Sequence, residues 1–328
     1  MRGKKGPLLR SPAVAPRRRT RGRRTWPQRL LIVVNSLLAI ACLSAAGVFN
    51  LIRSKAAELP VVDIGSEVRQ RKDETGPRNF LFVGTDDSDA LDKNDPVKKG
   101  RDQGEHLADV IMILRVDPAT KDASLLSIPR DTWLPIAPSW GKSKINSAFG
   151  GNDGPNTLIA TIKHNFGISI DNYAQVDFAG FKDLVEVLGG MTVFNTHPIR
   201  DPTTGLYLPL TGCIPLEPTQ ALAYARSRHL QYQDADGRWR HDPDSDLSRI
   251  KRQQDFTRRV LNRAIEKGAR NPATLARMVN TATTSGIAID PFTTPQDLIN
   301  LGHAFKNFDP KTLVTDTLPV TDANRGGA

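Results

Sequence analysis

An uncharged apolar run near the N-terminus constrains this chain more than any other feature. From Leu30 to Ile52, 23 consecutive residues contain no Asp, Glu, Lys or Arg. At about 1.5 Å of rise per residue, a helix of this length is roughly 35 Å long, enough to cross a hydrocarbon core of about 30 Å. A buried helix in a water-soluble domain rarely runs so far without a charge. Residues 30–52 are therefore predicted to form one transmembrane helix.

The charges on the two sides of this run set its expected orientation. Residues 1–29 hold eleven Lys/Arg and no Asp/Glu, whereas only Arg53 and Lys55 closely follow the run. By the positive-inside rule, the tail stays in the cytoplasm, where it also touches anionic membrane lipid, and the large domain lies outside the cell. A cleaved signal peptide is the competing interpretation, but the run continues ten residues beyond Cys42, which suits an uncleaved anchor better. The sequence predicts a single-pass protein of the cell membrane.

The remaining charge gives no support to a nucleic-acid partner. The whole chain carries +10 at pH 7 from 45 Lys/Arg and 35 Asp/Glu. Without the eleven basic residues of the tail, 34 basic residues face 35 acidic ones, a net charge of about −1. The two cysteines, Cys42 and Cys213, lie in the apolar run and in the external domain. An exported domain with one cysteine is held by its core and not by a disulfide.

The part after the apolar run divides into a spacer, a folded domain and a tail. Residues 53–78 are charged and interrupted by prolines, as in a juxtamembrane spacer; residues 79–320 carry the folded domain, and residues 321–328 form a short C-terminal tail. Strands are expected at 79–83, 110–116, 123–128, 191–195 and 206–210, with 201–205 as a hairpin loop between the last two, and helices at 155–166, 178–188, 219–226, 248–266, 272–284 and 295–305. The alternation predicts an α/β or α+β domain with helices around a central sheet.

Two aspartates at expected strand ends are candidate metal ligands. Asp86 follows the strand that stops at Gly84, and Asp109 opens the next strand. Each alone is more often a turn or capping residue. If the two strands are neighbours, the carboxylates meet at one edge of the sheet, where they suit Mg²⁺ together with water and phosphate oxygens.

Arginines follow the same element ends. Arg130 comes directly after a strand, at a proline that prevents its continuation, and Arg226 and Arg228 face the same way if the chain is extended there. Arg249 and Gln253 are one helical turn apart and share a helix face. Guanidinium groups match phosphate oxygens in pairs, so together with the carboxylates they indicate a metal-bound pyrophosphate, with a plain salt-bridge network as the alternative. Arg252 is rotated by about 100° from Gln253 on the helix and is expected to matter less.

The chain from about residue 79 to 320 resembles the LytR-CpsA-Psr family. Seven motifs occur in the order found in that family: NFLFVGTD at 79–86, ADVIMI at 108–113, SIPRD at 127–131, KINSAF at 144–149, LGGM at 188–191, ALAYARSR at 221–228 and DLSRIKRQQ at 246–254. An N-terminal anchor with a short cytoplasmic tail is similar to that family as well. The resemblance implies an α/β domain with a central mixed sheet flanked by helices on both faces, enclosing an apolar groove for a polyprenyl chain.

The resemblance also implies a function and a site. Members transfer a glycopolymer from an undecaprenyl-pyrophosphate carrier to the cell wall, usually to peptidoglycan, so an Mg²⁺-dependent phosphotransferase with a pyrophosphatase side activity is expected. By motif, Asp86 and Asp109 would be the catalytic carboxylates on the metal side. The phosphate-facing set would be Arg130, Arg226, Arg228, Arg249 and Gln253, with Lys144 as a weaker candidate. The groove is expected along apolar segments such as 158–166 and 178–188.

One departure and two alternatives accompany this interpretation. The family usually has an arginine two residues before the second aspartate, where this chain has Leu107, and His106 beside it is a possible substitute. A non-catalytic envelope protein that binds polyprenyl phosphates and regulates or scaffolds synthesis would keep the arginines and the groove without needing the carboxylate pair. A glycoside hydrolase also uses paired carboxylates, but its oxocarbenium site has no use for so many arginines.

Overall fold

The computed structural model describes residues 76–88, 107–268 except 152 and 244, 286–293, 308–309 and 312–321, together with positions 54, 60–65, 68, 91 and 95. Within these residues, no helix combines the length and the apolar character needed to cross a membrane. The expected transmembrane run at 30–52, the basic tail and the helices expected at 272–284 and 295–305 lie outside the described residues.

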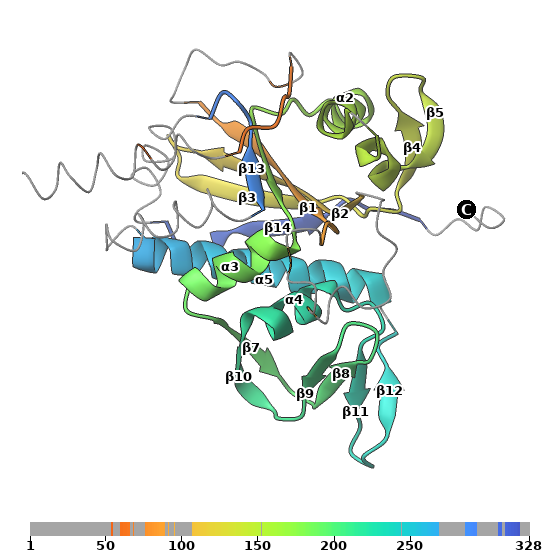
Figure 1. Cartoon of the computed structure of the whole chain (residues 1–328), viewed down its shortest axis with the longest axis vertical. Coiled ribbons are helices and arrows are strands. Elements are labelled where there is room, and N and C mark those ends of the chain that lie inside the picture. Colours follow the sequence, from red (N-terminus) through yellow and green to blue (C-terminus); the bar gives the residue numbers. More distant parts are fainter. Residues whose placement is uncertain are drawn as a thin grey trace, which may run out of the picture. The chain divides into compact units, whose positions relative to one another are not determined.

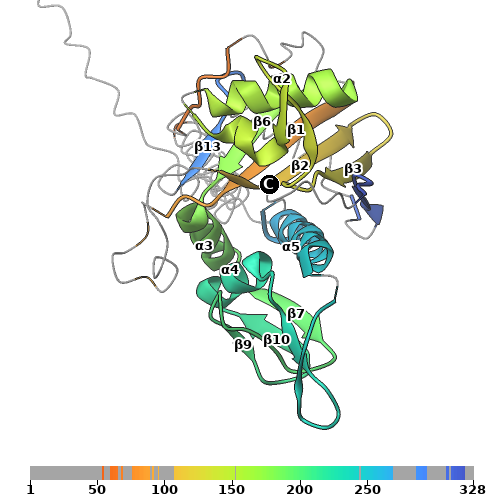
Figure 2. The ribbon, with the colours of Figure 1, turned by 90° about the vertical axis from the view of Figure 1, so that its right-hand side faces the viewer.

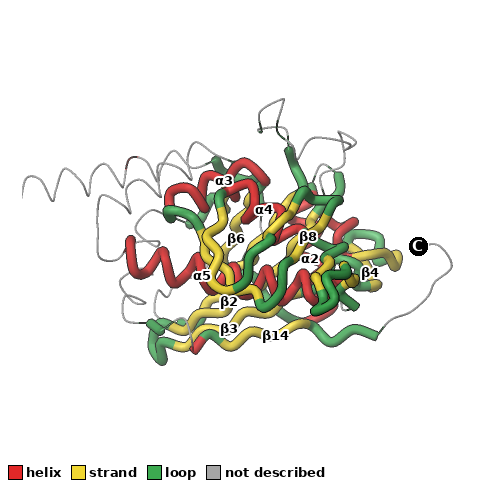
Figure 3. The backbone as a smooth tube through the Cα atoms, turned by 90° about the horizontal axis from the view of Figure 1, so that it is seen from below, coloured by secondary structure: helices red, strands yellow, loops and turns green. Residues whose placement is uncertain are grey.

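A mixed six-stranded sheet forms the centre of the domain (Figure 1). Its strands run in the order β13-β6-β1-β2-β3-β14, with bounds Ile287–Ile289, Asn172–Val176, Arg78–Thr85, Ala108–Asp117, Asp122–Ser127 and Val314–Thr317. The pairs β1/β6 and β3/β14 are parallel, and β1/β2, β2/β3 and β13/β6 are antiparallel. Figure 3 shows β2, β3 and β14 side by side along one part of this sheet. The expectation of a mixed sheet is confirmed.

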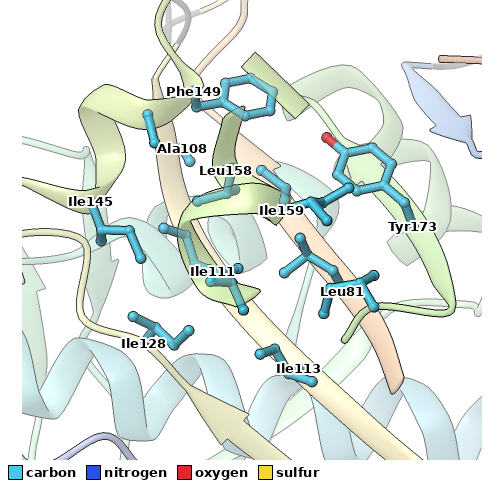
Figure 4. Packing of buried hydrophobic residues seen from close by; sticks show 14 of the residues in the cluster. Leu81, Ala108, Ile111, Ile113, Ile128, Ile145, Phe149, Leu158, Ile159 and Tyr173 are labelled. Atoms are coloured by element: carbon cyan, nitrogen blue, oxygen red, sulfur yellow. The ribbon is translucent and has the colours of Figure 1, made fainter. Parts of the chain in front are cut away.

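Helix α2 (Gly154–Phe166) covers one face of the sheet. Pro155 stands in its first turn, and Gly167 ends it with φ +67°, a left-handed conformation that glycine adopts at little cost. Its buried residues Leu158 and Ile159 pack with Leu81 of β1 and with alternate residues of β2, as Figure 4 shows. This cluster is the main core of the domain. The expectation that the segment 158–166 lines a lipid groove is therefore wrong, because its apolar side chains are packed in the core.

Helices α3 (Phe178–Val187), α4 (Pro218–Arg226) and α5 (Ser245–Gly268) lie on the opposite face, so helices cover both sides of the sheet (Figure 2). Asp177 caps the N-terminus of α3, because its carboxylate accepts a hydrogen bond from the Gly180 amide at 2.7 Å. Helix α4 starts at a proline and ends at Arg226. Because α3 and α4 contact each other and α4 also contacts α5, the three helices form one layer beneath the sheet.

Several short strands lie outside the central sheet. A two-stranded sheet joins β7 (Met191–Asn195) to β10 (Gly212–Leu216), and a four-stranded sheet has the order β12-β11-β8-β9 with bounds Trp239–His241, Gln231–Gln233, Ile199–Asp201 and Leu206–Leu208. The hairpin around 201–205 is present, but β9 pairs with β8 and not with the strand at 191–195. That pairing in the sequence analysis is wrong, because the three-residue strand β8 is too short to be recognised from its pattern. The remaining elements are β4 (Trp133–Ile136), β5 (Gly141–Lys144) and the 3₁₀ turn η2 (Ile145–Phe149).

Part of the expected spacer packs into the domain. Ile64 is completely buried and Val68 is almost so, and both belong to the main core cluster under α2. Val61 forms an isolated bridge with Ile289 of β13. The folded domain therefore begins before residue 79.

Candidate functional site

A deep cavity of about 600 Å³ opens on the face of the sheet that carries α3, α4 and α5. Its walls are mostly apolar; the side chains that form them include Phe82, Val110, Met112, Leu114, Phe181, Leu184, Leu222, Phe256 and Val260. They come from β1, β2, α3, α4 and α5. Of the two segments proposed to form a groove, 178–188 does line the cavity.

The strands divide their side chains between core and cavity. In β1, Leu81 is buried in the core under α2, whereas Phe82 lines the cavity. This is the alternation that a period of two residues imposes on a strand. Gly84, the next residue on the cavity side, has no room for a side chain, since a Cβ there would lie 3.0 Å from Cβ of Val110. A glycine at this position brings β1 and β2 close together where the cavity meets its polar end.

The two candidate metal ligands meet at that polar end. Thr85 of β1 is opposite Ala108 of β2, which puts Asp86 and Asp109 next to the same strand pair, and both line the cavity. The Asp86 carboxylate accepts a hydrogen bond from the Leu107 amide at 3.1 Å, and the Asp86 amide donates to the Leu107 carbonyl at 3.3 Å. Leu107 thus positions Asp86 through its backbone, a role that does not depend on its side chain. His106 lies outside the described residues.

Arg130 lies against the second aspartate. Its Nη1 donates to Asp109 Oδ1, and its Nε is 3.6 Å from Asp131 Oδ2. Asp131 also lies 3.5 Å from Lys144 Nζ and 3.6 Å from Arg228 Nη2. Sequence reasoning missed Asp131, which holds three cations in place beside the cavity. Lys144 pairs with Asp131 and is not among the residues that line the cavity.

Arg226 and Arg228 both line the cavity, as their spacing predicts. Helix α4 ends between them, and Ser227 has φ −57° and ψ 123°, so the chain is extended at this point. The guanidinium of Arg226 lies over the Phe178 ring at 4.3 Å, a cation–π contact. Ser227, which points the other way, is completely buried. The local extension is what turns two alternate side chains toward one cavity.

The buried side chain that fixes this segment is Asp201, at the end of β8. Its Oδ2 accepts hydrogen bonds from Ser227 Oγ at 2.6 Å, the Arg228 amide at 3.1 Å and the His229 amide at 3.0 Å. Its Oδ1 accepts from the amide and hydroxyl of Thr203 at 2.9 and 2.6 Å. Burial acts to raise the pKa of Asp201, but the hydrogen bonds from Ser227 and Thr203 outweigh it and lower the pKa below its ordinary value. The sequence analysis took this residue only as part of a turn.

Helix α5 contributes Arg249 and Gln253 to the same cavity. Arg249 is buried, and Gln253 Nε2 donates to the Ala225 carbonyl at 3.2 Å, which ties α5 to the last turn of α4. Arg252 points elsewhere: its Nη2 donates to the Ser227 carbonyl, and its Nη1 is 3.6 Å from Asp242. The rotation expected from helical geometry is confirmed, since Arg252 is not among the cavity-lining residues.

A third carboxylate, Asp177, also lines the cavity. Burial raises its pKa and the neighbouring Asp87 adds to that effect, while the Gly180 amide acts in the opposite direction. No sequence signal separated Asp177 from an ordinary helix cap. Its hydrogen bond to the first turn of α3 explains its position, so we assign it a structural role.

The donor set at this end suits a magnesium ion only when a phosphate is present. Within the described residues, no group of three or more His, Cys, Asp or Glu side chains is arranged to hold a metal. Asp86 and Asp109 offer carboxylate oxygens, which Mg²⁺ prefers, and Mg²⁺ often takes only one or two carboxylates, with phosphates and water completing its shell. The surrounding arginines are suited to the remaining phosphate oxygens. The arrangement fits an anion with a divalent cation at the end of an apolar cavity.

Sequence comparison places these features among known relatives. Residues 52–328 match the LytR_cpsA_psr family. The chain is 30% identical over 253 residues to the probable cell wall biosynthesis protein LcpB of Corynebacterium glutamicum, an alignment that covers 75% of this chain and 55% of LcpB. It is 29% identical over 263 residues to TagU of Oceanobacillus iheyensis, named a polyisoprenyl-teichoic acid–peptidoglycan teichoic acid transferase, which covers 76% of this chain and 72% of TagU. The chain thus spans about half the length of LcpB.

Comparison with solved structures gives the same fold. The LytR-Csp2A-Psr enzyme from Actinomyces oris aligns with a TM-score of 0.63 at 25% identity, covering 82% of this chain and 89% of that one. The central sheet with its helices is therefore shared with an experimentally determined structure.

Proposed function

Because this chain belongs to the LytR_cpsA_psr family, we propose that it is a membrane-anchored phosphotransferase that attaches a glycopolymer to peptidoglycan. The donor is the glycopolymer linked to undecaprenyl pyrophosphate. The observation that carries the proposal is the cavity itself, whose apolar walls lead to an end lined by Asp86, Asp109 and arginines. A polyprenyl pyrophosphate also consists of a long apolar part and an anionic end, so its two parts match the two parts of the cavity. The name of TagU supports a polyisoprenyl-linked donor and a peptidoglycan acceptor.

The reaction begins with the lipid-linked donor bound in the cavity. The polyprenyl chain lies among the apolar walls, and its pyrophosphate lies between Arg226, Arg228 and Arg249. A hydroxyl of the acceptor attacks the phosphorus that bears the sugar. The bond from that phosphorus to the bridging oxygen breaks, undecaprenyl phosphate leaves, and the hydroxyl proton is lost to a base. Water in place of the acceptor would give pyrophosphate hydrolysis as a side activity.

Catalysis of this kind depends on position and on charge. Phosphoryl transfer requires little covalent chemistry from the protein. Cations fixed around the phosphates therefore supply most of the stabilisation of the transition state. Arg130 is held by Asp109 and Arg228 by Asp131, so their guanidiniums are oriented before substrate binds. A magnesium ion, held by Asp86 and Asp109, would neutralise further charge on the pyrophosphate.

The anchor completes the proposal. A helix at 30–52 with a cytoplasmic tail would keep the domain on the outer side of the cell membrane, next to the lipid-linked donor and the peptidoglycan acceptor. The run of 23 uncharged residues supports this placement.

The function is tested by a transfer assay. The full-length protein in detergent, given a glycopolymer on undecaprenyl pyrophosphate and purified peptidoglycan, is expected to release undecaprenyl phosphate and form a covalent glycan–peptidoglycan product. Addition of a chelator is expected to stop the reaction, and Mg²⁺ to restore it. The purified protein should also carry a polyprenyl phosphate that mass spectrometry detects. Absence of metal-dependent turnover with any polyprenyl pyrophosphate would refute the proposal.

Alanine substitutions of single arginines are expected to lower the transfer rate only where the arginine lines the cavity. Arg228→Ala and Arg226→Ala should each lower the transfer rate about ten- to a hundredfold, since a lost charge-assisted bond to phosphate costs roughly 1.5 to 3 kcal/mol. Arg240→Ala is the matched control, because this exposed arginine pairs with Asp234 in the β11–β12 hairpin. Its rate should equal that of the unmodified protein. Equal losses in all three variants would contradict the site assignment.

A further inference from the structure

A second hollow, of about 330 Å³, lies between the small β-elements and the start of α5. Among the residues that line it are Phe194, Asn195, His197, Tyr232, Asp242 and Arg252. None of these six lines the first cavity. The phosphotransfer chemistry described above therefore leaves this hollow without a role.

The hollow is lined by aromatic side chains, one of which is largely exposed to solvent. Phe194 on β7 is 62% exposed, an unusual position for a phenylalanine that has a core nearby. The rings of His197 and Tyr232 lie 5.8 Å apart with their planes tilted by 56°. Flat apolar faces beside polar groups are suited to a ligand that has both an apolar face and hydroxyl groups.

The polar side chains of the hollow supply both hydrogen-bond donors and acceptors. Asp242 and Arg252 are largely buried and lie 3.6 Å apart, so their charges offset each other. Lys251 also lines the hollow and is exposed to solvent. Asn195 is 8% exposed, and its Nδ2 has no hydrogen-bond partner among the described residues. A buried amide donor left without a partner is costly, and a hydroxyl-bearing ligand with its bound water offers acceptors for this wall. A hydroxylated ring, whose hydroxyl groups both donate and accept hydrogen bonds, matches this lining.

The hollow is connected to the candidate active site through one segment. Residues 224–232 contribute to both, with Arg226 and Arg228 in the cavity and Tyr224 and Tyr232 in the hollow. Arg252, in the hollow, donates to the carbonyl of Ser227, the residue between the two arginines. A ligand in the hollow therefore lies along the same stretch of chain that carries the phosphate-facing side chains.

We propose that this hollow binds the sugar rings of a glycan. Aromatic faces and buried amide and ion-pair groups supply the recognition, and the segment 224–232 contributes side chains to both the hollow and the candidate active site. Whether these sugars belong to the acceptor strand or to the donor glycopolymer rests on the proposed function, whereas sugar binding itself does not.

Direct binding tests the proposal with two probes. Soluble glycan strands released from peptidoglycan, and the glycopolymer freed from its lipid, are each titrated calorimetrically into the full-length protein in detergent. At least one probe is expected to bind. Binding of the peptidoglycan strand alone assigns the hollow to the acceptor, and binding of the glycopolymer alone assigns it to the donor. Binding of neither probe overturns the proposal.

Substitutions inside and outside the hollow test whether the sugar binds there. Phe194→Ala removes an exposed ring and should weaken binding at least tenfold, while Tyr207→Ala, which removes a ring that is 58% exposed on β9 and lines neither cavity nor hollow, should leave it unchanged. Unchanged binding by Phe194→Ala overturns the proposal. Arg228→Ala should bind sugar normally while losing transfer. If no transfer is ever observed but Phe194→Ala still weakens sugar binding, the proposed function fails and the sugar site stands.

Discussion

Replacing Asp109 with alanine is expected to lower glycopolymer transfer at least a hundredfold. The change removes one of the two candidate metal-side carboxylates and also frees Arg130, whose guanidinium Asp109 holds against the cavity. Loss of a single preorganised group that stabilises transition-state charge typically costs about a hundred- to a thousandfold. Asp86→Ala should have a similar effect, because its carboxylate lines the same end of the cavity. The initial rate of undecaprenyl phosphate release measures both variants.

The matched control for these variants is Asp122→Ala. Asp122 is an exposed aspartate at the start of β3, at the turn end of the β2–β3 pair, and does not line the cavity. Its variant should transfer at the normal rate. A strain that lacks the protein provides a second measurement: Asp109→Ala is expected to fail to complement it while still binding polyprenyl phosphate. Full complementation by both Asp86→Ala and Asp109→Ala would instead support a lipid-binding scaffold that does no chemistry.

Asp201→Asn is expected to destabilise the protein by about 1 to 3 kcal/mol, the usual cost of leaving a buried hydrogen-bond donor without its acceptor. Both oxygens of Asp201 accept hydrogen bonds, from Ser227, Arg228 and His229 on one side and from Thr203 on the other. Whichever way an asparagine amide is turned, its NH₂ group faces donors. At about 2 to 4 °C for each kcal/mol, the melting temperature should fall by roughly 2 to 12 °C.

The same variant should also lose transfer at temperatures where it remains folded. Asp201 holds the residues on either side of Arg228, so its loss displaces Arg226 and Arg228 from their positions at the cavity. At least a tenfold lower rate at 25 °C is expected from the displaced phosphate contacts. Asp234→Asn is the control, because Asp234 accepts hydrogen bonds from the amides of Asp236 and Arg238 in the exposed turn between β11 and β12. A lower melting temperature with an unchanged rate would show that Asp201 does not position the arginines.

The stability difference between Asp201→Asn and the unmodified protein should depend on pH. Hydrogen bonds hold the pKa of Asp201 below its ordinary value of 3.8 in the folded state. Its stabilisation is therefore present above pH 3.8 and is lost as the pH falls through the folded-state pKa. Melting curves between neutral and strongly acidic pH should show the two proteins approaching each other at the acidic end.

Local patterns predicted helices α2 to α5 and strands β1, β2, β3, β7 and β9. They did not predict β6, β13 and β14 of the central sheet or the other short strands. Alternation in β1 and β2, the proline and glycine at the ends of α2, and the charged turn between β2 and β3 are all properties of neighbouring residues. Spacing predicted that Arg226 and Arg228 share one side and that Arg249 and Gln253 share a helix face. The tertiary structure brings the two pairs together, since all four residues line the cavity. The partner of β9 was predicted wrongly because strand pairing between distant segments is decided by packing.

By itself, the sequence determined helices α2 to α5, the strands with clear patterns such as β1 and β2, the side of each helix or strand that the candidate residues occupy, and the family. Only the tertiary structure decided which distant groups hold these residues in place. Asp201 is 26 residues from Ser227, and no periodicity links them, yet their hydrogen bond fixes the arginine segment. Asp131 likewise gathers Arg228 from a separate part of the chain. Such contacts form only when β8, α4 and the strand ends have packed, because the energy of a buried hydrogen bond depends on surroundings that local sequence does not contain.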